Sequence, residues 1–205
     1  MPITLDTSLP PSLYPLAWLV GSWEGIGALH DGDDASVRIE QQLTCTPQED
    51  GTLAWYCRTY RVDAPAPLPP DSAFARSHSP AGGTGERSLL HRESGVLRVG
   101  DLLPGQDEQA ARAAKPGSAA SQLSYALSAQ LQRSGESSDS STVAAEEIWQ
   151  GEARGPRIQL ALGERGAIAG TRMIGYISGR LMWLWERPGA DGELAPYLSV
   201  ELDRA

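Results

Sequence analysis

The chain has 205 residues and a formal net charge of −9 at pH 7, and its length suits one globular domain with a packed core. The acidic balance argues against binding to nucleic acid or to an anionic membrane surface, since both require clustered positive charge. No apolar run approaches the roughly 20 residues of a membrane-spanning helix, and the first residues lack the pattern of a signal peptide. We therefore expect a cytoplasmic protein.

Residues 10–20 (PPSLYPLAWLV) predict a short N-terminal helix. Prolines stand at the front, where the first turn of a helix tolerates them, and the apolar stripe that follows stops at Gly21. We expect this helix to act as a lid or plug on the rest of the domain.

After Gly21 the pattern changes to short β-like runs separated by Gly, Pro and Asp. Ten strands are predicted, at Ser22–Leu29, Ser36–Leu43, Leu53–Arg61, Arg87–Arg92, Val96–Val99, Ala144–Gln150, Ile158–Leu162, Gly170–Ile177, Leu181–Arg187 and Tyr197–Leu202. Short runs of this kind with turn residues between them are typical of an all-β domain.

Three junctions predict tight hairpins, because they contain residues that accept a positive φ: Glu93-Ser94-Gly95, Ser178-Gly179 and Pro188–Gly192. Sequential antiparallel strands favour a ten-stranded up-and-down β-barrel closed by the short N-terminal helix, with a sandwich as the alternative. We predict one domain over residues 1–205 with loop or disordered inserts at about 62–85 and 101–142. Within the second insert, SQLSYALSAQLQ suits either a strand or a helix.

The most specific motif is G-x-W-x-G-x-G, formed by Gly21, Trp23, Gly25 and Gly27. It is not a dinucleotide-binding motif, because no strand precedes it and no βαβ unit follows. In a strand these four residues share one face. Glycines there let a neighbouring backbone or a ligand approach closely, so the motif is either a structural closure or a ligand contact.

Together with this motif, PLAWLVGSWEGIG (15–27), RMIGYISGRLMWLWE (172–186) and ADGELAPYLSVELDR (190–204) resemble the nitrobindin family, also described as fatty-acid-binding-protein-like proteins of actinobacteria. The resemblance implies a ten-stranded antiparallel barrel closed by a short helix. Members of the haem-binding kind hold ferric haem through one histidine near the C-terminus and isomerise peroxynitrite to nitrate.

The position of that histidine is matched here by Tyr197, and the histidines present are His30, His78 and His91. A neutral imidazole donates strongly to haem iron, whereas a phenol must ionise and starts from a pKa of about 10. Ligation by tyrosinate would need a nearby arginine, for which Arg172 and Arg204 are candidates. We therefore expect no cofactor and no metal site, with haem b as the alternative.

Three hypotheses follow for the function. In the first, the barrel has lost haem and binds a small apolar molecule, with Gly21, Trp23, Gly25 and Gly27 at the rim and the Tyr197 hydroxyl in the pocket. The second is a haem-binding peroxynitrite isomerase with a non-histidine axial ligand. The third is a fatty-acid or lipid carrier, which would place a buried basic residue against the carboxylate, with Arg38, Arg58 and Arg172 as candidates.

Two pairs of residues have a structural interpretation. Cys45 and Cys57 are expected to be small buried thiols, although a disulfide between them is the alternative. Trp183 and Trp185 would share one face of a strand, where lining of the barrel is favoured over a cage for a cation.

Overall fold

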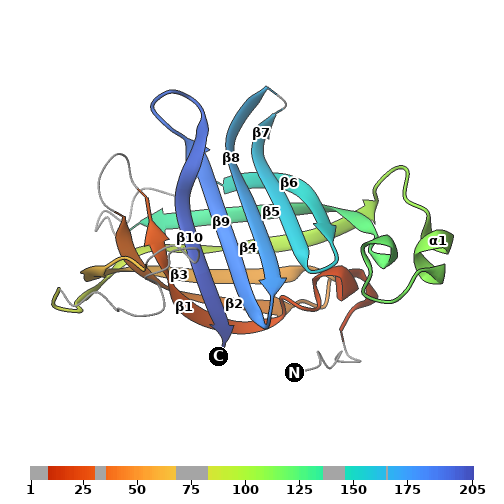
Figure 1. The fold of residues 1–205 in the computed structure, drawn as a ribbon, viewed down its shortest axis with the longest axis horizontal. Helices are drawn as coiled ribbons and strands as arrows, with labels where there is room; N and C mark the ends of the chain where they lie inside the picture. Colours follow the sequence, from red (N-terminus) through yellow and green to blue (C-terminus); the bar gives the residue numbers. More distant parts are fainter. Residues whose placement is uncertain (1–8, 31–35, 68–82, 136–145, 165) are drawn as a thin grey trace.

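Ten antiparallel strands form a closed barrel in this computed structural model, which describes residues 9–30, 36–67, 83–135, 146–164 and 166–205 (Figure 1). Each strand pairs with its neighbours in sequence, and β1 pairs with β10 to close the sheet. The strands are β1 (Gly21–Leu29), β2 (Val37–Pro47), β3 (Leu53–Pro65), β4 (Arg87–Leu102), β5 (Ser124–Gly135), β6 (Glu146–Arg154), β7 (Arg157–Glu164), β8 (Ala167–Ile177), β9 (Arg180–Pro188) and β10 (Leu194–Arg204). The predicted fold class is confirmed.

A short 3-10 helix, η1 (Pro11–Leu16), precedes β1 and begins with proline as expected. Its Leu13 and Leu16 side chains are fully buried in the hydrophobic core. The predicted helix is therefore present, while its role in closing the barrel stays a prediction. Two further short helices, α1 (Glu108–Ala113) and η2 (Ala119–Ser121), lie between β4 and β5. None of the helices in the described ranges is long and apolar enough to span a membrane.

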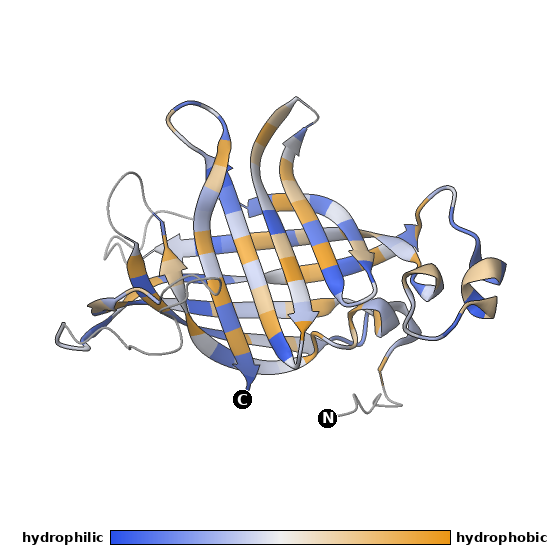
Figure 2. Ribbon diagram, viewed as in Figure 1, coloured by the Kyte–Doolittle hydropathy of each residue, from blue (hydrophilic) through white to orange (hydrophobic). Residues whose placement is uncertain are grey.

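Hydrophobic and polar residues alternate along the strands, as Figure 2 shows, because successive side chains point to opposite faces of a sheet. In β2, for example, Ile39, Gln41, Leu43 and Cys45 are buried, whereas the residues between them are more exposed. The buried faces of all ten strands meet inside the barrel and form its core.

The hairpin predicted at Glu93-Ser94-Gly95 is wrong, because β4 runs without interruption through these residues. Gly95 is needed there for packing and not for a turn. A Cβ atom at this position would lie 1.9 Å from the backbone oxygen of Gln130 on β5. The two predicted strands Arg87–Arg92 and Val96–Val99 are therefore one.

The insert predicted at 101–142 is also wrong in part, because residues 124–135 form β5 between β4 and β6. The count of ten strands is right because this additional strand compensates for the divided β4. In the insert predicted at 62–85, residues 62–65 complete β3, and residues 68–82 lie outside the described part.

Candidate functional site

The glycine–tryptophan motif lies at the end of the barrel next to η1. Trp23 Nε1 donates a hydrogen bond of 2.9 Å to the backbone oxygen of Leu19, and the Trp23 ring packs against Tyr176 with 5.9 Å between ring centroids. Trp23 pairs with Arg204 near the end of β10. Tyr197 lies seven residues earlier, about 23 Å away along the strand. Tyr197 is therefore distant from Trp23, whereas Gly27 at the other end of the motif pairs with Val200, three residues after Tyr197.

Gly25 and Gly27 lie where β1 and β10 approach each other closely. A Cβ atom on either glycine would lie 2.1 Å from a backbone oxygen of β10, that of Glu201 or of Ser199 respectively. Gly21 differs, because its φ of +120° is itself unfavourable for other residues. These contacts are a physical reason for glycine at positions that bring β1 and β10 together. Contact of the motif with a ligand stays a prediction.

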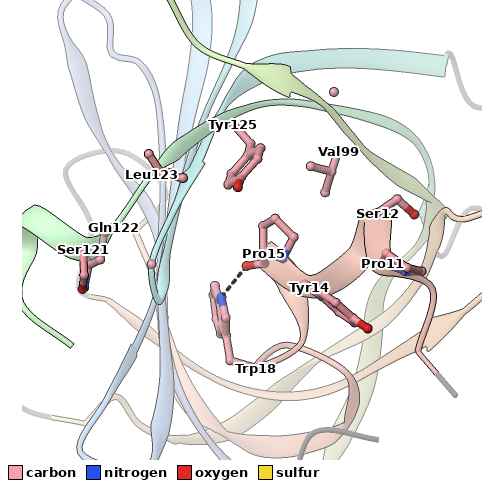
Figure 3. A pocket seen from close by; sticks show the side chains of 12 residues that line it. Pro11, Ser12, Tyr14, Pro15, Trp18, Val99, Ser121, Gln122, Leu123 and Tyr125 are labelled. Atoms are coloured by element: carbon pink, nitrogen blue, oxygen red, sulfur yellow. Dashed lines mark hydrogen bonds between the residues drawn. The ribbon is translucent and has the colours of Figure 1, made fainter. Parts of the chain in front are cut away.

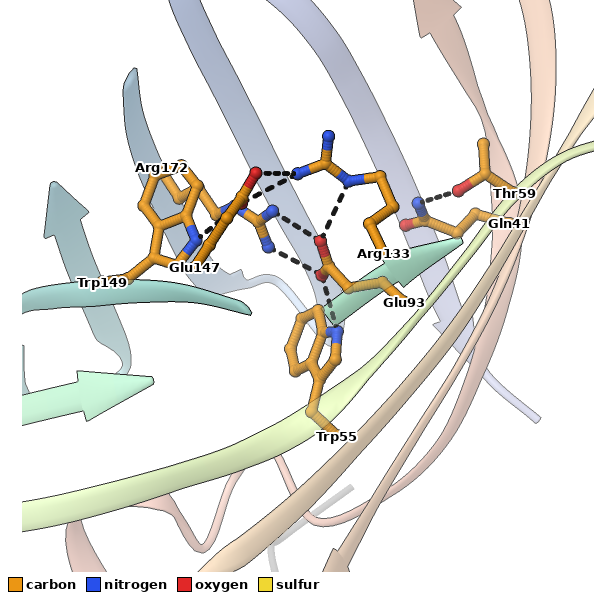
Figure 4. A network of polar contacts seen from close by, with 8 residues as sticks. All are labelled: Gln41, Trp55, Thr59, Glu93, Arg133, Glu147, Trp149 and Arg172. Carbon is orange, nitrogen blue, oxygen red and sulfur yellow. Dashed lines mark hydrogen bonds and ion pairs between the residues drawn. The ribbon is translucent and has the colours of Figure 1, made fainter. Parts of the chain in front are cut away.

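Inside the barrel, a buried ion pair joins β4 to β8 (Figure 4). Arg172 donates two hydrogen bonds to Glu93, of 2.7 Å to Oε1 and 2.6 Å to Oε2, and both side chains are only 1% exposed. Trp55 Nε1 donates a third bond of 3.0 Å to Glu93 Oε1. Burial alone would raise the pKa of Glu93, but the arginine charges and hydrogen bonds outweigh burial and hold it below its usual value.

A second pair extends this network towards the end of the barrel away from η1, which we call the distal end. Arg133 of β5 donates to Glu147 of β6 at 2.9 Å, and Arg133 Nε lies 3.6 Å from Glu93. Trp149 Nε1 also donates to Glu147, at 3.1 Å (Figure 4). Each of the two carboxylates therefore has one principal arginine partner.

Three tryptophans surround the Arg172 guanidinium. Its central carbon lies 4.3 Å from the ring centroid of Trp149, 4.4 Å from that of Trp185 and 5.5 Å from that of Trp183. Trp183 and Trp185 are both buried and line the barrel, as predicted. The alternative interpretation, an aromatic cage for a cation, also applies, but the cation within the cage is the protein's own Arg172.

Arg187 and Tyr197 lie against each other at the distal end. The Arg187 guanidinium carbon is 4.1 Å from the centroid of the Tyr197 ring and 4.2 Å from that of Trp185. Tyr197 packs edge-on against Trp185 with 4.9 Å between centroids, at an irregularity in the β10 pairing. Burial lowers the pKa of Arg187, and the nearby arginine charges act in the same direction.

The histidines occupy different surroundings. His91 of β4 is 5% exposed, and burial, with the charges of nearby arginines, lowers its pKa to about 4 against the attraction of Glu93. His30 lies between Ser36 and Ser199, with contacts of 2.8 and 3.4 Å. His78 lies outside the described residues. Within the described ranges no group of three or more His, Cys, Asp or Glu is arranged to hold a metal ion.

The arginines that the sequence suggested are placed differently from Arg187. Arg204 lies over the Trp23 ring, and Arg172 is held by Glu93. Arg58 is held on the outside of the barrel by Tyr56, and Arg38 lies on the same strand as Ile39 but on the alternate face. Period-two alternation would have identified Arg187, because it lies two residues after Trp185 on the same strand face.

Two pockets lie outside this cluster. The first, of about 520 Å³, lies beside η1 and is lined by uncharged residues that include Tyr14, Trp18 and Tyr125 (Figure 3). The second, of about 420 Å³, is lined by residues of β2, β3 and β4 and of the segments that precede β2 and β4, and it includes Arg61 and Glu86. Both cysteines are free and buried, as expected, and burial raises the pKa of both thiols.

Comparison with protein families matches residues 12–204 to the THAP4-like, heme-binding beta-barrel domain. The chain belongs to the nitrobindin family. A protein of Paenarthrobacter aurescens named peroxynitrite isomerase is 28% identical over 219 aligned positions, which cover all of this chain and 99% of the relative. A ferric nitrobindin-like protein of Cutibacterium acnes is 25% identical over the full length of both chains.

Among solved structures, the crystal structure of Rv2717c from M. tuberculosis superposes with a TM-score of 0.52 and 16% sequence identity. The superposition covers 97% of this chain and 99% of that one. This likeness supports the barrel fold of the nitrobindin chain.

The family description implies haem, so the donors at the distal end can be compared with what ferric haem needs. β10 contains no histidine, and Tyr197 is packed between Trp185 and Arg187. His91 is a neutral imidazole at neutral pH, but it lies within the arginine-rich interior. The residues described at this end do not form a site that holds haem through a histidine of β10.

Proposed function

We propose that this nitrobindin-family barrel is a binding protein whose distal end takes a small, largely apolar molecule, and that it has lost the histidine that holds haem iron. The observation that carries the proposal is the cluster of Trp185, Tyr197 and Arg187. The partly exposed Tyr197 ring is held rigidly against the buried Trp185, and a partly buried guanidinium beside it can orient a ligand.

The donor atom of residue 197 is the physical reason to expect no haem chemistry. An imidazole coordinates iron as a neutral group, whereas the Tyr197 phenol must first lose a proton. Without an axial ligand for haem iron, this chain would lack the haem-dependent isomerisation that the family resemblance implies. Catalysis is therefore not part of the proposed function.

The second candidate is a haem-dependent peroxynitrite isomerase with Tyr197 as the axial ligand. One observation favours it: a positive guanidinium, that of Arg187, lies 4.1 Å from the Tyr197 ring, where it would stabilise a phenolate. Several relatives that align with the whole chain carry the name peroxynitrite isomerase.

Haem titration of the purified protein separates the two candidates. For the binding protein, added ferric haem gives no sharp Soret band and no stoichiometric end point, and the Tyr197→His variant alone gains both. For the isomerase, the unmodified protein gives a tight ferric spectrum with the resonance Raman signature of tyrosinate, and Tyr197→Phe abolishes it. A tight ferric spectrum in the unmodified protein would overturn the first candidate.

A further inference from the structure

The ionised side chains inside the distal half of the barrel carry an excess of positive charge. Three of them are arginines and two are glutamates: Arg133, Arg172, Arg187, Glu93 and Glu147. His91 adds no charge at neutral pH, since its pKa is lowered to about 4. One positive charge at this partly buried end of the barrel therefore has no counter-charge among these residues.

The excess charge can be assigned to Arg187. Glu93 is occupied by Arg172 and Glu147 by Arg133, in both cases through hydrogen bonds shorter than 3 Å. In the described ranges no ion pair or hydrogen bond of the Arg187 side chain is found. Ring faces and not a carboxylate hold Arg187 in place. Its guanidinium N–H groups thus remain available to an acceptor.

A second, independent observation is a set of buried donors without acceptors in the same cluster. Arg172 Nε, Trp183 Nε1 and Trp185 Nε1 are all buried and have no hydrogen-bond partner in the described part of the chain. The residues that carry them are 2%, 5% and 1% exposed. Indole and guanidinium nitrogens only donate, so Glu93 and Glu147 do not supply enough acceptors for all the donors of this cluster. A buried acceptor without a partner, Gln41 Oε1, belongs to the separate Gln41–Thr59 contact (Figure 4).

We propose that the ligand of the distal end is an organic carboxylate, whose oxygens meet the Arg187 guanidinium while its apolar part lies beside Tyr197. The inference rests on the proposed binding function and specifies the class of ligand. A carboxylate supplies the missing negative charge and an acceptor for Arg187, and it matches the paired N–H groups of an arginine. A neutral molecule of the same shape supplies neither.

Binding of octanoate and of octan-1-ol, measured by calorimetry and by tryptophan fluorescence, tests this inference. The two probes have the same alkyl length and differ in the charged head. We expect octanoate to bind about ten- to a hundredfold more tightly than the alcohol, the range that a charge-assisted hydrogen bond provides. Equal affinities would overturn the carboxylate assignment and leave the binding function intact. Absence of binding by both probes would overturn both proposals.

Variants of Arg187 locate the head group. Arg187→Gln should weaken octanoate binding to about the affinity of octan-1-ol and so remove the preference. Arg187→Lys, which keeps the charge but not the planar fork, should retain a reduced preference. Arg180→Gln is the matched control, because Arg180 lies on the same strand but on the outer face, where it pairs with Glu201 and Asp203. A folded Arg187→Gln protein that still prefers octanoate would place the carboxylate elsewhere and overturn the proposal.

Discussion

Glu93 and Arg172 bridge the interior of the barrel from strands that are not neighbours. β4 and β8 are separated in the sheet by β5, β6 and β7, and the two residues are 79 positions apart in the chain. Two hydrogen bonds of 2.6 and 2.7 Å join them, and both side chains are almost completely buried. The pair therefore links two opposite walls of the barrel that no backbone hydrogen bonds connect directly.

Replacement of one member of this pair should destabilise the fold strongly. Glu93→Gln leaves the Arg172 charge buried without compensation, so we expect the free energy of unfolding to fall by about 3 to 5 kcal/mol. Arg172→Met should cost a similar amount. The double variant should lose less than the sum of the two single losses, because neither charge is then left alone.

Equilibrium urea unfolding of the four proteins measures these values. Arg112→Met is a suitable control, since Arg112 forms only an exposed ion pair with Glu108 and should change stability by less than about 0.5 kcal/mol. A loss below about 1 kcal/mol for Glu93→Gln would contradict the role assigned to the pair.

This pair also marks the limit of what the sequence predicts. Local alternation and turn residues predict the closed barrel and the inward face of Trp183 and Trp185, because these depend on neighbouring residues only. The partner of Glu93 depends on the diameter of the barrel and on the register of four consecutive strand pairings. No local pattern contains that information.

The hairpin predicted at residues 93–95 is wrong for a related reason. A glycine after a polar pair is typical of a turn, and Gly95 was interpreted in that way. In the barrel, Gly95 lets the backbones of β4 and β5 lie close together, because it has no Cβ atom. The contact is with Gln130, more than thirty positions away. A hairpin at this place does not predict that the Glu93 side chain lies inside the barrel, where the ion network forms.

The buried imidazole of His91 predicts a pH dependence of stability. Its pKa is about 4 in the folded protein and about 6.5 when unfolded, so between these values the unfolded chain binds a proton that the folded chain does not. The free energy of unfolding should therefore fall as the pH falls from 6.5 to 4, by on the order of 3 kcal/mol. Glu93, whose pKa is lowered from its ordinary value, adds to the loss of stability at the acidic end of this window and below it.

Urea unfolding at several pH values measures this slope, and the His91→Gln variant identifies its source. The variant should show a much flatter dependence between pH 4 and 6.5. The charged neighbours Glu93, Arg133, Arg172 and Arg187 are unchanged in it. An equal slope in both proteins would assign the effect to other groups.

The two thiols should be inert in the folded protein. Cys45 and Cys57 are each 1% exposed, and burial raises the pKa of both, so little of the reactive thiolate exists at neutral pH. A thiol reagent such as DTNB should modify neither in native buffer and both in denaturant. Rapid modification of one thiol in the native protein would indicate that the wall formed by β2 and β3 opens locally.

Alanine at Gly25 or Gly27 should test the two readings of the glycine–tryptophan motif. The new Cβ atom would meet a β10 backbone oxygen at 2.1 Å, and since backbone cannot rotate away, each change should cost about 1 to 3 kcal/mol. Gly135→Ala is the matched control, because among the described residues, its chain neighbours aside, no atom lies within 4 Å of its added Cβ. It should be neutral or slightly stabilising, since alanine restricts the unfolded chain. If the two motif variants instead keep their stability but bind octanoate more weakly, contact with a ligand and not closure of the barrel explains the motif.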